Sequence, residues 1–136
     1  MTSANCKLFL SVTALVEAVA GLCLLILPAV VFAVLLGSDH ATVDATFVGR
    51  LAGAALLAIS IASWMARPDT RTPAQIGLLT GILVYNAAAT LLLVYAGAVL
   101  KMMGVLLWPA VVIHAILSVW CFGCLRSERQ SGEILR

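Results

Sequence analysis

The sequence predicts an all-α polytopic membrane protein in which four transmembrane helices form one up-down bundle. The chain of 136 residues is 63% hydrophobic and only 10% charged, and its mean hydropathy is +1.14. Soluble domains, by contrast, are about 45–50% apolar and about 25% charged. The charged residues leave four apolar segments between them, each long enough to cross the roughly 30 Å core of a bilayer. These segments are residues 8–36, 46–66, 74–100 and 104–125.

The composition also excludes several classes of protein. A soluble globule of this size, a disordered chain, a disulfide-stapled secreted domain and a nucleic-acid-binding protein with a basic face are all inconsistent with so apolar a chain. Backbone groups in lipid cannot bond to water, so apolar runs of this length are helical. Because the connections are short and no linker or repeat separates the segments, residues 1–136 are expected to form a single domain.

The first segment, residues 8–36, is expected to be an uncleaved helix that bends. An Ala-Val-Ala triplet at 18–20 has the form of a signal-peptide cleavage site. However, Glu17 interrupts the apolar run before this triplet, and apolar residues continue after it. At 1.5 Å per residue the segment is about 43 Å long, which exceeds the thickness of the hydrocarbon. Pro28 cannot donate a backbone hydrogen bond, so the bend is expected there.

Small residues line one face of each of the first three segments. They are Ala14, Ala18 and Gly21 on the first, Gly49 and Gly53 on the second, and Gly77 and Gly81 on the third. This spacing lets helix backbones approach closely, which favours a tight bundle. Either glycine pair is also suited to joining two copies of the chain in a homo-oligomer.

The fourth segment carries a C-x-x-C pair, Cys121 and Cys124, near its end. Such a pair can be redox-active or bind a metal, and the four-helix disulfide-forming quinone reductases place a similar pair at a helix end. This chain has no second pair in an outer loop to relay electrons. The two thiols are therefore interpreted as small packing residues, and no metal site is predicted.

The distribution of Lys and Arg predicts the orientation in the membrane. Six basic residues fall on the side that holds both termini: Lys7, Arg67, Arg71, Arg126, Arg129 and Arg136. Arg50 and Lys101 fall on the other side. Because positive charges stay in the cytoplasm, both termini are expected to be cytoplasmic. Trp64 and Trp108 are expected to anchor the cytoplasmic and outer helix ends, since amphipathic rings favour the membrane interfaces.

Polar side chains inside the apolar segments are the candidate functional groups, because an ionisable group at the bilayer centre costs a few kcal/mol or more. Counted at 1.5 Å per residue from the cytoplasmic helix ends, Glu17, Asn86 and His114 lie about 14, 18 and 17 Å deep. We therefore expect these three side chains to converge near the midplane, with Tyr85 and Thr90 beside them.

Two interpretations of this convergence stay open. In the functional one, the side chains bind a lipid-like or quinone-like headgroup or a proton, since a carboxyl and an imidazole together can titrate near neutral pH. In the structural one, they bond to one another or to backbone carbonyls and set the helix register. No cofactor is predicted, although His114 could serve as a single axial ligand to a haem or chlorophyll pigment. A di-iron site is excluded, because the segments hold only one carboxylate and one histidine.

Arg50 is a separate candidate. It lies about 24 Å above the cytoplasmic end of the second segment, near the outer headgroups, where a guanidinium can reach water or phosphate. A sharper interpretation pairs Arg50 with an anionic headgroup at the outer mouth of a cavity, beside Trp108 and a helix break at Pro109.

Four short motifs resemble a group of small, uncharacterised bacterial membrane proteins with four helices. The motifs are G-R-L-A-G at 49–53, W-M-A-R at 64–67, Y-N at 85–86 and L-W-P-A-V-V-I-H-A at 107–115. The resemblance covers most of the chain and implies a bacterial inner-membrane location, but no activity. Glu17 is also similar to the lone glutamate in the first helix of the small multidrug exporters. This chain is longer than those exporters and lacks their aromatic pattern.

Two functions therefore remain as hypotheses. The first is a non-enzymatic protein, either an accessory subunit of a larger membrane complex or an element that binds lipid or another hydrophobic ligand. The second is a small proton-coupled transporter or an intramembrane enzyme that uses Glu17 and His114. The glycine faces and the small number of polar residues favour the first. The sequence contains no phosphate loop, nucleophile elbow or zinc-protease motif. The lipid bilayer is an expected partner and nucleic acid is not.

Overall fold

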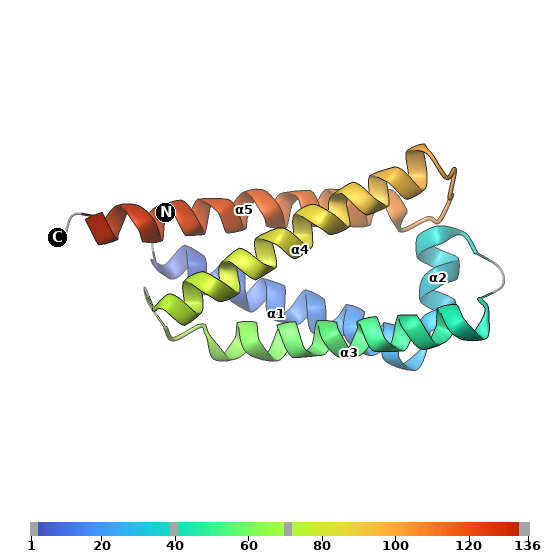
Figure 1. Ribbon diagram of the computed structural model, residues 1–136, viewed down its shortest axis with the longest axis horizontal. Coiled ribbons are helices and arrows are strands. Elements are labelled where there is room, and N and C mark those ends of the chain that lie inside the picture. Colours follow the sequence, from blue (N-terminus) through green and yellow to red (C-terminus); the bar gives the residue numbers. More distant parts are fainter. Residues whose placement is uncertain (1–2, 39–40, 70–71, 134–136) are drawn as a thin grey trace.

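Helices account for nearly all of the chain that the computed structural model describes, which is residues 3–38, 41–69 and 72–133. Within these residues there are five α-helices and no strand: α1 (Ser3–Ile26), α2 (Pro28–Leu36), α3 (Val43–Met65), α4 (Pro73–Ala98) and α5 (Leu107–Glu133). Of these, α1, α3, α4 and α5 are long and apolar enough to cross a membrane. The prediction of four apolar helices is confirmed, and they run alternately up and down (Figure 1).

Pro28 divides the first predicted segment into two helices, as expected. Leu27 leaves the helical conformation (φ −128°, ψ 50°), and Pro28 begins α2, where its missing N–H is tolerated. α2 ends at Gly37, whose φ of +72° lies in the left-handed region that favours glycine. This short helix lies at the end of the molecule opposite the termini (Figure 1), where it contacts α1, α3 and α5.

Threonine side chains cap the starts of α3 and α4. The Ala45 N–H donates to Thr42 Oγ1 (3.2 Å), and the Gln75 N–H donates to Thr72 Oγ1 (3.1 Å). These bonds satisfy donors that have no partner within the first helical turn. Both helices consequently begin close to the predicted starts at 46 and 74.

The last helix begins later than predicted. α5 starts at Leu107 instead of 104 and continues past 125 to Glu133. Gly104 belongs to the preceding loop, where it packs so closely on the backbone of Leu35 that a Cβ would overlap it. The backbone N–H of Leu106 donates to the carbonyl of Val34 (2.9 Å). These contacts tie the loop before α5 to α2.

The four long helices form two pairs, α1 with α3 and α4 with α5. A Cβ added at Gly53 would lie 2.7 Å from Gly21 O, and one added at Gly21 would lie 2.8 Å from Gly53 O. The α1 and α3 backbones are therefore in direct contact. Ser60 Oγ also donates to the carbonyl of Ala14 (2.7 Å). The close approach predicted for the small residues of these two helices is confirmed.

The other glycine pair has no such role within the described part of the chain. Nothing lies within 4 Å of a Cβ added at Gly77 or Gly81, and both glycines are exposed. The glycines on α3 and on α4 have the same spacing, but only the glycine face of α3 packs against the backbone of a neighbouring helix.

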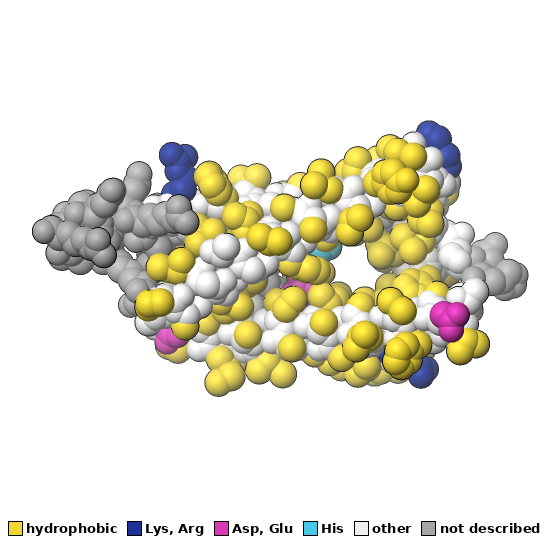
Figure 2. Space-filling model, viewed as in Figure 1, with side chains coloured by type: hydrophobic (Ala, Val, Ile, Leu, Met, Phe, Trp, Pro, Cys, Tyr) yellow, Lys and Arg dark blue, Asp and Glu magenta, His cyan; other side chains and the backbone are white. Residues whose placement is uncertain are grey.

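The two helix pairs meet at the end of the molecule that holds both termini. The buried apolar core there combines side chains of α1, α4 and α5: Cys6, Phe9, Leu10, Leu79, Ile82, Leu117, Cys121, Cys124 and Leu125. Toward the other end the pairs separate, and an opening between them is seen in Figure 2. The bundle therefore consists of two tight helix pairs that share this buried core.

The basic residues that predicted the orientation are only partly described. Lys7, Arg67 and Arg126 lie toward the end of the molecule that holds both termini. Arg71 and Arg136 lie outside the described residues, as does the side chain of Arg129. On the face drawn in Figure 2, the basic side chains of the described residues lie near the two ends of the molecule.

Replacing Gly53 with alanine should destabilise the protein, because the new Cβ would meet backbone atoms of Gly21 and Leu25 at 2.7 Å. Overpacking of this kind costs about 1–3 kcal/mol. Thermal unfolding in detergent, followed by circular dichroism, should show a clearly lowered Tm. Gly81→Ala is the matched control, since its Cβ would enter open space and alanine favours the helix by about 0.5–1 kcal/mol. Equal Tm values for the two variants would contradict the α1–α3 backbone contact.

Candidate functional site

A group of polar side chains lies where α1 meets α4 and α5. It consists of Glu17 from α1, Tyr85 and Asn86 from α4, and His114 from α5, and is called the polar cluster below. Glu17 is 1% exposed and Asn86 0%. Tyr85 and His114 are half-buried. Three helices therefore contribute to one polar group, as expected from the similar depths of Glu17, Asn86 and His114 along their segments.

Asn86 holds His114 through a side-chain hydrogen bond. Asn86 Nδ2 donates to the carbonyl of Ile82 (2.9 Å), which directs Oδ1 toward His114 Nδ1 at 2.8 Å. Because Oδ1 can only accept, Nδ1 carries the proton. In the neutral ring, Nε2 then has a lone pair, and no described residue bonds to it. The geometry thus selects one tautomer and leaves Nε2 available as an acceptor.

Tyr85 connects this pair to Glu17. Its ring meets the His114 ring edge to face, with centroids 5.7 Å apart and an interplanar angle of 82°. Its side chain also interacts with the Glu17 carboxyl. The carboxyl oxygen Oε1 is buried and has no hydrogen-bond partner among the described residues. A continuous series of contacts therefore runs from Glu17 through Tyr85 to His114.

Thr13 is a member of this region that sequence reasoning missed. It lies one helical turn before Glu17 on the same face of α1, is fully buried, and its Oγ1 has no hydrogen-bond partner within the described chain. A buried oxygen without a partner costs about 1–3 kcal/mol. The i, i+4 spacing of Thr13 and Glu17 was the available signal. Together they place two unsatisfied acceptors on one side of α1.

Two other hydroxyl groups are satisfied within their own helices. Thr90 Oγ1 donates to the carbonyl of Asn86 (2.8 Å), and Ser118 Oγ donates to the carbonyl of His114 (2.9 Å). Bonds to the carbonyl four residues earlier are common for these side chains in helices. Thr90 is therefore next to the polar cluster along α4, as expected, but its hydroxyl bonds to the backbone.

Arg50 and Trp108 are not part of the polar cluster. Arg50 is exposed on α3, and Trp108 is exposed at the start of α5, where a Cβ added at Gly97 would lie 3.1 Å from its ring. The helix break expected at Pro109 is absent, because this residue lies in the first turn of α5, where proline is tolerated.

The C-x-x-C pair lies in the apolar core. Cys121 and Cys124 are both buried, and Cys121 Sγ donates to the carbonyl of Leu79 (3.1 Å). Their packing role is consistent with the interpretation of the sequence. The described residues also contain no group of three His, Cys, Asp or Glu side chains that could hold a metal ion.

The neutral His114 ring should carry its proton on Nδ1. Two-dimensional ¹⁵N NMR of histidine-labelled protein can identify the tautomer from the two ring-nitrogen shifts, with His40→Gln used to assign the signals. Asn86→Leu should remove the acceptor and return His114 to a mixture of tautomers. Thr90→Val is the control, because Thr90 bonds only to the Asn86 backbone. A proton found on Nε2 in the unmodified chain would contradict the assigned geometry.

Comparisons of the chain with protein-family models, with curated proteins and with solved structures find no match.

Proposed function

We propose that this chain is a multi-pass protein that binds a hydrophobic ligand between its two helix pairs, with the ligand's polar headgroup at the polar cluster. The single observation that carries the proposal is the Glu17 carboxyl. It is buried among apolar helices, and its Oε1 has no partner within the described residues. A carboxyl in such a place is stable when it is neutral or when a bound group donates to it.

The chemistry of the cluster favours a headgroup that donates hydrogen bonds. Glu17 Oε1, Thr13 Oγ1 and, in the neutral ring, His114 Nε2 are all able to accept. Hydroxyl groups such as those of a quinol or a lipid headgroup match these acceptors. The opening between the helix pairs (Figure 2) offers a place for the apolar part of such a molecule.

The proposed location is the bacterial inner membrane, with both termini in the cytoplasm. Support comes from the four long apolar helices and from Lys7, Arg67 and Arg126, which lie toward the end that holds the termini. Positive charges at one end favour its retention in the cytoplasm. The resemblance of the four sequence motifs to bacterial four-helix proteins points to the same location.

A second candidate function is that of an accessory subunit in a larger membrane complex. The observation that favours it is the exposed face of Gly77 and Gly81, where a Cβ would meet open space. Such a face suits close packing against a helix of a partner subunit or of a second copy. This role is compatible with ligand binding at the polar cluster, since the two use different residues.

Glu17→Gln should reduce the amount of bound ligand. Native mass spectrometry of gently solubilised protein should detect a co-purifying small molecule on the unmodified chain and at least a tenfold lower occupancy on the variant. Ser118→Ala is the control, because its hydroxyl bonds only to the backbone of α5. Equal occupancy in both variants would contradict the proposal. Proton movement in vesicles that depends on Glu17, without a retained ligand, would instead favour the transporter hypothesis.

A further inference from the structure

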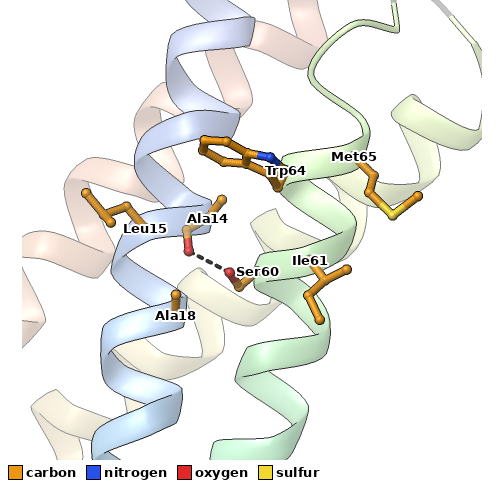
Figure 3. A pocket seen from close by; sticks show the side chains of 7 residues that line it. All are labelled: Ala14, Leu15, Ala18, Ser60, Ile61, Trp64 and Met65. Carbon is orange, nitrogen blue, oxygen red and sulfur yellow. Dashed lines mark hydrogen bonds between the residues drawn. The ribbon is translucent and has the colours of Figure 1, made fainter.

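A groove on the surface of the α1–α3 pair lies apart from the polar cluster. Its volume is about 310 Å³, and its lining is almost entirely apolar. The small residues Ala14, Ala18 and Ser60 form its floor, and the larger Leu15, Ile61 and Trp64 flank it (Figure 3). The Ser60 hydroxyl donates to the carbonyl of Ala14, so the floor presents no unsatisfied donor. The groove therefore suits an alkyl chain.

Two cations lie beyond one end of this groove. α1 and α3 are antiparallel, with Gly21 opposite Gly53 and Ala14 bonded to Ser60. Continuing this register toward the end of α3 brings Lys7 near Arg67, which lies two residues beyond Met65, the last residue of that helix. Lys7 is seven positions before Ala14 on α1, so these two residues lie near the same face of that helix. The apolar groove thus runs toward a pair of positive charges.

Arg67 is held in place by Trp64, which also forms one wall of the groove. The guanidinium carbon lies 3.1 Å from the centroid of the Trp64 ring, and Arg67 Nε donates to the Trp64 carbonyl (2.9 Å). The remaining guanidinium N–H groups have no partner in the described part of the chain, and no acidic side chain there pairs with Lys7. Among the described residues, therefore, neither cation is paired with an acidic side chain.

We propose that this groove binds an anionic phospholipid, with one acyl chain along Ala14 and Ala18 and the phosphate between Lys7 and Arg67. The occupant follows from charge complementarity: an apolar groove that ends at two cations matches a molecule with an alkyl chain and an anionic head. This site is independent of the proposed function at the polar cluster, because Glu17 is buried and does not line the groove.

Trp64 provides a direct reporter for this lipid. In a variant with Trp108→Phe and Trp120→Phe, Trp64 is the remaining tryptophan. The protein is reconstituted in phosphatidylcholine vesicles that contain a minor fraction of lipid with brominated acyl chains, which quench indole fluorescence on contact. Brominated phosphatidylglycerol should quench Trp64 more strongly than the same fraction of brominated phosphatidylcholine. High salt should reduce the difference.

Variants test the charges and the groove separately. Lys7→Gln leaves the surroundings of Trp64 intact and should reduce the preference for the anionic lipid about fivefold, and Arg67→Gln by a similar factor. Lys101→Gln, at the other end of the helices, is the charge control and should leave the preference unchanged. Ala18→Leu should fill the groove and reduce quenching by either lipid, whereas Ala88→Leu on the exposed surface of α4 should not.

Three results would overturn this proposal. The first is equal quenching by the two brominated lipids. The second is an anionic preference that persists when both Lys7 and Arg67 are replaced. The third is quenching that falls as the protein-to-lipid ratio rises, which would indicate that a helix from a second copy occupies the groove. Glu17→Gln should not alter the quenching of Trp64, so failure of this site and failure of the polar cluster are distinguishable.

Discussion

The burial of polar side chains where the two helix pairs meet is the interaction on which the rest of this structure depends. Apolar contacts alone gain little when helices associate in lipid, because the lipid tails are equally apolar. Glu17 on one pair instead interacts with Tyr85 on the other, while Tyr85 and Asn86 contact His114 within the α4–α5 pair. They specify which face of α1 meets α4 and α5.

The second connection between the pairs lies at the opposite end of the molecule. There α2, which exists because Pro28 interrupts the first apolar segment, bonds to the loop before α5 through Val34 and Leu106. Gly104 allows the same loop to approach the backbone of Leu35. The two helix pairs are thus connected at two places, by the polar cluster and by α2. The opening between the pairs is seen in Figure 2.

The sequence was sufficient to predict the apolar helices, the bend at Pro28 and the meeting of Asn86 with His114, because these follow from composition, proline geometry and helical rise. It was not sufficient to predict the division into two pairs. The glycine spacing is the same at 49–53 and at 77–81, yet only the first face meets a backbone. Spacing shows that a helix face can be approached closely, but it does not identify the neighbour.

The polar cluster, too, could be predicted only in part from the sequence. The depths of Glu17, Asn86 and His114 followed from counting residues, whereas the roles of Tyr85 and Thr13 depend on rotation of α1 and α4 about their axes. Arg50 and Trp108 lie outside the cluster because they are near the other end of their helices. The hydropathy of a residue on a membrane helix does not show whether its side chain is buried or exposed, since lipid-facing and buried positions are both apolar.

The most direct measurement of the central claim is a double-mutant cycle between Glu17 and Tyr85, which lie on different helix pairs. The unfolding free energies of Glu17→Gln, Tyr85→Phe and the double variant are compared in the same detergent. If the two side chains interact across the join, the effects are non-additive, with a coupling of about 0.5–1.5 kcal/mol. Strictly additive effects would contradict the contact and, with it, the joining of the helix pairs through the polar cluster.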